Sequence, residues 1–158
     1  MINNKEKIIE YFKSGIKEVK DFRIGIEHEK FLFNTKDNKR IDYPKVKEMF
    51  TALTEFGWNP VFEKENIIGL NKGGKNITLE PGNQIELSGD KLNHMHEACA
   101  ESQDYLFELK QVTKKLDIKI VSAGFDPISK LEDIPNNPKQ RYELMTKDMP
   151  LGGELSLD

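Results

Sequence analysis

The chain of 158 residues contains a single cysteine, Cys99, and has no long uninterrupted run of apolar residues. One cysteine cannot form a disulfide within the chain, so a fold stapled by disulfides is excluded. No apolar stretch approaches the roughly 18 residues that a membrane-spanning helix needs. The N-terminus also lacks a basic start followed by an apolar signal core. These features predict a cytoplasmic protein that does not associate with a membrane.

An excess of positive charge is also missing. The 24 lysines and arginines are nearly balanced by 27 aspartates and glutamates, so the formal net charge is −3. Without a basic field, no nucleic-acid partner is expected. There are no paired cysteines and no His-x-x-x-His spacing to suggest zinc, and His94 and His96 face different directions on a helix. The 37% of hydrophobic residues is enough for one core, which predicts a single domain over residues 1–158.

The pattern of apolar residues predicts an α+β fold with a mainly antiparallel sheet and helices packed on one face. Alternation indicates a strand at 22–33, a three-strand meander that ends at 77–80, a strand at 85–88 and another strand at 118–125. Helical spacing indicates packing helices at about 4–17, 43–57 and 91–116, and a short helix at 139–147. Cys99 lies on the apolar stripe of the helix at 91–116, so it is predicted to be a small core residue.

Four glutamates fall on these strands with a common parity. Glu27 and Glu29 share one face of the first strand, while Glu80 and Glu86 lie on the two strands that flank a Pro-Gly turn. In the simplest register all four project from one face, and the apolar residues project from the other toward the helix at 91–116. Grouped carboxylates repel, and rigid oxygen ligands suit Mg²⁺ or Mn²⁺, which commonly serve phosphoryl transfer. On spacing alone, an ordinary solvated acidic face stays open as the alternative.

The same stretches resemble the plant and proteobacterial type of glutamate–cysteine ligase. The resemblance covers most of the chain from about residue 22, in motifs at 24–31, 78–89, 96–101, 124–127, 133–142 and 149–150. It implies a core fold similar to that of glutamine synthetase. It also implies an ATP- and magnesium-dependent joining of the γ-carboxyl of L-glutamate to the amine of L-cysteine through γ-glutamyl phosphate. That reaction is the first step of glutathione biosynthesis.

The resemblance also implies roles for particular residues. The four glutamates match acidic metal-site positions, and Arg141 matches an arginine expected near the carboxylate of the substrate glutamate. Lys30 could meet a nucleotide phosphate, although a solvated strand lysine is the plainer interpretation. Cys99 matches a cysteine that plant members use in a redox-sensitive disulfide, but its downstream partner is absent from this chain. No residue is assigned a catalytic role.

Family members are roughly two to three times longer than this chain, beyond the size of one ordinary domain. The resemblance therefore predicts the N-terminal portion of an incomplete catalytic core. Two alternatives stay open: a carboxylate–amine ligase with another acceptor amine, and a non-catalytic module that binds metal or glutamate. An apolar edge left by an incomplete core would also allow a homo-oligomer.

Overall fold

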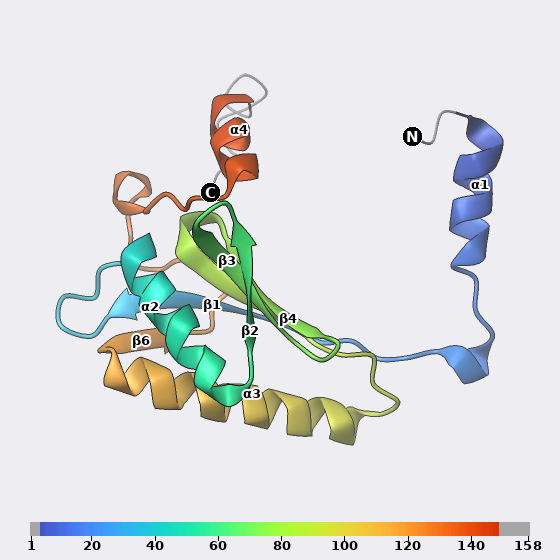
Figure 1. The fold of residues 1–158 in the computed structure, drawn as a ribbon, viewed down its shortest axis with the longest axis horizontal. Helices are drawn as coiled ribbons and strands as arrows, with labels where there is room; N and C mark the ends of the chain where they lie inside the picture. The colour runs from blue at the N-terminus through green and yellow to red at the C-terminus, as the bar shows by residue number, and fades with distance from the viewer. Residues whose placement is uncertain (1–3, 149–158) are drawn as a thin grey trace.

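The computed structural model describes residues 4–148. Within them, six strands form one sheet in the order β2-β3-β4-β5-β1-β6, and every pairing is antiparallel. The strands are β1 Glu27–Asn34, β2 Asn59–Glu63, β3 Asn66–Lys72, β4 Lys75–Glu80, β5 Gln84–Ser88 and β6 Ile118–Val121. The α-helices are α1 Lys5–Ser14, α2 Tyr43–Leu53, α3 Met95–Lys115 and α4 Gln140–Asp148 (Figure 1). The predicted α+β fold with a mainly antiparallel sheet is confirmed.

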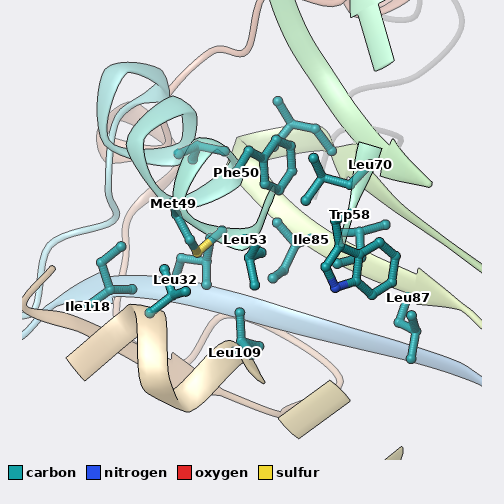
Figure 2. Packing of buried hydrophobic residues seen from close by; sticks show 14 of the residues in the cluster. Leu32, Met49, Phe50, Leu53, Trp58, Leu70, Ile85, Leu87, Leu109 and Ile118 are labelled. Atoms are coloured by element: carbon teal, nitrogen blue, oxygen red, sulfur yellow. The ribbon is translucent and has the colours of Figure 1, made fainter. Parts of the chain in front are cut away.

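Helices α2 and α3 cover the apolar face of the sheet. Helix α2 begins where the Asp42 side chain accepts a hydrogen bond from the Lys45 backbone N–H, with Pro44 in the first turn. Its apolar face is fully buried against inward side chains of β1, β3, β4 and β5 and against α3 (Figure 2). This core includes Leu32, Met49, Phe50, Leu53, Leu70, Ile77, Leu79, Ile85, Leu87 and Leu109. The helices thus leave the glutamate-bearing face to other parts of the chain.

The prediction that Cys99 lies in the core is wrong, because the Cys99 side chain is exposed. Helix α3 begins at Met95, capped by the His94 side chain, and Met95 is also exposed. The buried stripe of the first half runs one position away, through Ala98 and Glu101. Both carboxylate oxygens of Glu101 accept the backbone N–H of Asp90, at 3.2 Å. Apolar periodicity does not detect a buried polar residue such as Glu101. The sequence pattern therefore predicted the wrong side of the first half of α3 to be buried.

The strands β2, β3 and β4 form the predicted meander, and the turn Pro81–Asn83 carries the chain into β5. In that turn Gly82 has φ +62° and Asn83 has φ +58°. A Cβ atom added at Gly82 would lie 2.7 Å from the side chain of Ile134. Glycine is therefore required by both the left-handed backbone and the close neighbour. Asn83 is fully buried, and its side chain donates to the Ile41 carbonyl at 3.1 Å.

Some predicted elements differ from the structure at their ends or in their packing. The strand predicted at 118–125 ends at Val121. The first strand begins at Glu27 rather than at residue 22, because the preceding segment makes only an isolated bridge between Ile24 and Leu92. Helix α1 forms as expected, capped by Asn4, but it buries none of its residues. Figure 1 shows α1 set apart from the sheet at the end of an extended segment. The prediction that it packs on the core is wrong for the described structure.

Residues 122–148 contact the side of the sheet that α2 and α3 do not cover, where Asn137 and Tyr142 bond to Glu80. After β6, which pairs with β1, residues 122–139 lead to α4, which lies above the sheet in Figure 1, whereas α3 runs below it. The short helix predicted at 139–147 is thus confirmed as α4. The motif at 149–150 lies outside the described residues.

Candidate functional site

The register of the sheet places the four glutamates on one face. Glu29 of β1 lies directly opposite Glu86 of β5, and Glu86 lies opposite Thr78 of β4. Glu27 is opposite Ser88, and Glu80 is opposite Gln84. Directly opposed side chains on antiparallel strands share a face. We call the surface formed by Glu27, Glu29, Glu80 and Glu86 the acidic face. Its predicted common orientation is confirmed by this register.

Glu86 lies at the centre of the acidic face and is half-buried. Burial raises the pKa of the Glu86 carboxyl, and the negative charges of Glu80, Glu27 and Glu29 raise it further, while a hydrogen bond from Ser88 opposes the rise. The Ser88 hydroxyl donates to Glu86 Oε1 at 3.1 Å. The other three carboxylates are therefore close enough to act on Glu86. Ionising Glu86 in this setting costs more than it would in water.

Glu80, in contrast, is well supplied with donors. The Thr78 hydroxyl donates to Glu80 Oε1 at 2.8 Å, and the Tyr142 hydroxyl of α4 donates to Oε2. The Lys139 ammonium lies 3.7 Å from Oε1. The Asn137 side chain also donates to the Glu80 backbone carbonyl at 2.9 Å. The segment that begins α4 is therefore attached to the acidic face through one glutamate.

Lys139 and Arg141 bring positive charge to this end of the face. The Lys139 residue is 8% exposed, and its ammonium lies 5.4 Å from the centre of the Tyr142 ring. Burial lowers the pKa of Lys139, the Glu80 charge raises it and the Arg141 charge lowers it again, for a net decrease. Arg141 is exposed and its guanidinium carbon lies 4.8 Å from the same ring. Arg141 is thus beside the acidic face, as its expected substrate role requires, but the role itself stays a prediction.

Lys30 does not belong to the acidic face. It is opposite Ile85 in the register and therefore points to the side that α3 covers, where it is 6% exposed. Burial lowers the pKa of the Lys30 ammonium. His28 shares this side and contacts the Ser102 hydroxyl at 3.0 Å. Strand alternation thus separates Lys30 from its glutamate neighbours, and the geometry gives no support to the predicted contact of Lys30 with a nucleotide phosphate at the acidic face.

The far end of this sheet face is closed rather than open. Phe31 and Phe33 follow the parity of Glu29 but are 8% and 0% exposed. The Arg40 guanidinium lies 4.9 Å and 5.6 Å from the centres of these two rings. It also pairs with Asp126 at 2.8 Å and donates to the carbonyl of Gly82. The sheet face opposite α2 and α3 is therefore open only at the end that carries the glutamates.

The donor set of the acidic face suits a hard divalent cation, because it consists of carboxylate oxygens. The side chains are nevertheless turned toward protein donors in this structure: Gln84 donates to Glu29, Ser88 to Glu86, and Tyr142 to Glu80. Between residues 4 and 148, no three His, Cys, Asp or Glu side chains are grouped as they would be around a metal ion. The residues fit such an ion in chemistry, and holding it requires their side chains to rotate.

Reasoning from sequence missed Tyr142 and Lys139 as partners of Glu80. Both stand in the motif at 133–142 that carries the family resemblance, but nothing in local periodicity links that segment to β4. Strand alternation alone puts Gln84, Ser88 and Thr78 on the face of the glutamates, and the register confirms that placement. The part of the chain that the structure describes contains no helix long and apolar enough to span a bilayer.

Comparison with known proteins agrees with the motifs. The chain is 43% identical over 155 residues to the chloroplastic glutamate–cysteine ligase of Medicago truncatula. The match covers 98% of this chain and 30% of that protein. It is 42% identical to chloroplastic glutamate–cysteine ligase A of Oryza sativa subsp. japonica and 41% identical to the Arabidopsis thaliana ligase, with 98% of this chain covered. The chain thus spans about a third of the length of these relatives, 32% and 30% for the last two. These relatives are chloroplastic, so the cytoplasmic location of this chain stays a prediction.

All four glutamates of the acidic face and the segment that attaches α4 to Glu80 lie within residues 23–158. The sequence profile of glutamate-cysteine ligase family 2 matches residues 23–158, which is most of the chain. The chain therefore belongs to glutamate–cysteine ligase family 2.

Proposed function

We propose that this chain is the N-terminal part of an ATP-dependent glutamate–cysteine ligase and that its acidic face holds Mg²⁺ or Mn²⁺. The observation that carries the proposal is the convergence of four carboxylates on one sheet face, where Glu29 and Glu86 stand directly opposite each other. The raised pKa of Glu86 supports it: burial is the main cause, and the negative charges of Glu80, Glu27 and Glu29 raise the pKa further. Such an arrangement is costly unless a cation offsets it.

In this proposal the four glutamates provide the ligands. Glu27 and Glu29 are exposed, and Glu29 can turn toward Glu86 if it gives up its hydrogen bond from Gln84. Glu80 is already oriented by Thr78 and Tyr142. A divalent cation held there would neutralise the carboxylates and would polarise the phosphoryl oxygens of ATP. Side chains of this chain orient the substrates and keep the acidic face in one geometry.

The reaction that the family name implies needs two displacements. An oxygen of the glutamate γ-carboxylate attacks the γ-phosphorus of ATP, ADP leaves, and a γ-glutamyl phosphate is formed. The amine of cysteine then attacks the acyl carbon, inorganic phosphate leaves with the electron pair of the broken C–O bond, and the amine loses a proton. Arg141 would hold a carboxylate of the substrate glutamate, since its planar guanidinium can donate two parallel hydrogen bonds.

A second candidate is a module that binds cation and glutamate without turnover. It is favoured by one observation, namely that the chain spans only 30% of the length of the Medicago relative. Residues that complete a nucleotide or cysteine site in the longer relatives can lie in the remaining part. The two candidates share the acidic face and differ only in whether this chain performs the chemistry.

The first experiment measures cation binding to the chain, using Mn²⁺ and electron paramagnetic resonance. Glu29→Gln and Glu86→Gln should each weaken Mn²⁺ binding about tenfold or more, by analogy with the loss of other groups that hold a metal site. Glu55→Gln is the matched control, because Glu55 is an exposed glutamate outside the acidic face. Binding that is absent, or equal in all variants, would refute the metal site.

The second experiment measures phosphate release from ATP in the presence of glutamate and a panel of amines. Release that requires both glutamate and cysteine supports the ligase. Release that requires glutamate but is indifferent to cysteine indicates a ligase with another acceptor amine. Mn²⁺ binding without any release identifies the non-catalytic module.

A further inference from the structure

The attachment of α4 to the acidic face uses both oxygens of Glu80. Tyr142 donates to Oε2, while Thr78 and Lys139 lie on the side of Oε1, at 2.8 Å and 3.7 Å. Two of these three groups come from the segment at 139–142, about sixty residues away from Glu80 in the chain. The other glutamates of the acidic face are not bridged in this way by the hydrogen bonds and ion pairs found between residues 4 and 148.

Tyr142 is placed to donate a hydrogen bond to Glu80. The residue is 8% exposed, and its hydroxyl donates to Glu80 Oε2. A carboxylate oxygen has two lone pairs, so a hydrogen bond from Tyr142 leaves room for a further ligand on the same group. Such a bond restricts the orientation of a carboxylate without using up its capacity to bind a cation.

Lys139 has a different effect, because it carries a charge. Its side chain is 9% exposed, and its ammonium is 3.7 Å from a carboxylate that is 21% exposed. A positive charge at that distance in a poorly hydrated place compensates Glu80 and repels any other cation that approaches. Lys139 thus competes with a divalent ion for the same carboxylate.

We propose that Tyr142 and Lys139 are positioning residues that act through Glu80 with opposite effects on the cation affinity of the acidic face. Tyr142 orients the carboxylate and so increases the affinity, whereas Lys139 supplies a resident positive charge and so decreases it. This inference rests on the proposed function, since it assumes that the acidic face binds a divalent cation. It assigns to the start of α4 the role of setting how tightly that ion is held.

Opposite changes in Mn²⁺ affinity on losing Tyr142 and on losing Lys139 distinguish this role from mere anchoring of α4. If Tyr142 and Lys139 only fastened the helix, loss of either would loosen the same segment and change Mn²⁺ affinity in the same direction. Lys139→Arg keeps the charge and provides the conservative comparison. Tyr43→Phe is the matched control for losing a tyrosine hydroxyl, because Tyr43 donates to the Ile67 carbonyl from helix α2, at 3.2 Å.

The test measures Mn²⁺ affinity by electron paramagnetic resonance and the melting temperature by circular dichroism for each variant. Tyr142→Phe should weaken Mn²⁺ binding about tenfold. Lys139→Met should tighten it about fivefold, and Lys139→Arg should leave it within about twofold of the wild type. Tyr43→Phe should lower the melting temperature without changing the affinity.

Three results would count against these assignments. Affinities that fall together in Tyr142→Phe and Lys139→Met, in step with the melting temperature, would show anchoring alone and overturn the inference. Wild-type binding that neither variant changes would also overturn it while leaving the metal site intact. No Mn²⁺ binding by the wild type would overturn the proposed metal site itself, and the inference with it.

Discussion

Replacing Asp126 by asparagine should reveal how much one buried ion pair contributes at the closed end of the sheet. The side chains of Arg40 and Asp126 are 2% and 9% exposed and lie 2.8 Å apart. Asparagine can still accept the backbone N–H groups of Ile128 and Ser129, which contact Asp126 at 2.9 Å and 3.0 Å. It leaves the Arg40 charge buried without its counter-ion. We therefore expect a loss of about 3 kcal/mol in the free energy of unfolding at pH 7.

The pH dependence of that loss identifies its cause. Burial alone would raise the pKa of Asp126, but the N–H groups of Ser129 and Ile128 and the Arg40 guanidinium outweigh it, and they lower the pKa from 3.8 to about 2. A carboxyl with a lowered pKa in the folded state stabilises the fold above its unfolded pKa. That contribution is lost as the pH falls through 3.8 toward about 2. This pH-dependent part of the stability amounts to about 2 kcal/mol.

Urea unfolding followed by tryptophan fluorescence is a suitable assay. Trp58 is the single tryptophan, is 2% exposed in the core and donates to Glu108 at 2.7 Å, so unfolding changes its surroundings completely. Between pH 5 and pH 2 the gap in unfolding free energy between wild type and Asp126→Asn should narrow by about 2 kcal/mol. The control, Asp117→Asn, removes an exposed partner of Lys36 and should cost less than about 1 kcal/mol. A gap that stays constant with pH would refute the ionised pair as the source of stability.

Three further predictions concern other parts of the fold. Glu86→Gln should raise the urea midpoint at pH 7, because burial and the neighbouring carboxylates raise the pKa of Glu86; this advantage should vanish as the pH falls below that pKa, and an unchanged midpoint would contradict it. Deleting residues 1–16 should leave the urea midpoint unchanged, because α1 buries nothing, and should reduce any self-association seen by sedimentation velocity. Gly82→Ala should cost about 1–3 kcal/mol by thermal unfolding, because its backbone is left-handed and Ile134 is close; a loss below 0.5 kcal/mol, roughly the effect of an ordinary surface change, would contradict it.

The arrangement of the glutamates was predictable because strand alternation has only two outcomes. A slip of one residue would have moved Glu80 or Glu86 into the space now filled by Leu79 and Ile85, which are 0% exposed. Burying an unpaired carboxylate there is far more costly than placing it on the open face. The same rule places Lys30 on the helix side, and it could have been applied to that residue from the sequence alone.

Helix packing was less predictable, since an apolar stripe shows what a helix can bury but not whether a partner is there to cover it. Helix α1 carries Ile8, Phe12 and nearby apolar residues at helical spacing, yet Phe12 is 73% exposed. In α3 the buried stripe includes Glu101, whose carboxylate accepts a backbone N–H at the end of the sheet. Satisfying that N–H is a tertiary requirement, so apolar periodicity alone placed Cys99 on the wrong side.

The partners of Glu80 could not be predicted from the sequence either, because they are also tertiary contacts. They affect where on the acidic face negative charge is left uncompensated. Lys139 and Tyr142 reach Glu80 across the fold, and Lys139 already compensates its charge. The charged groups that act most strongly on the pKa of Glu86 are the carboxylates of Glu80, Glu27 and Glu29. Uncompensated negative charge therefore lies around Glu86, toward Glu29, and not at the end of the face beside α4. In the proposed metal site, a divalent ion would gain most by binding between Glu86 and Glu29, with Glu80 as the oriented ligand at its edge, where Lys139 would oppose it least.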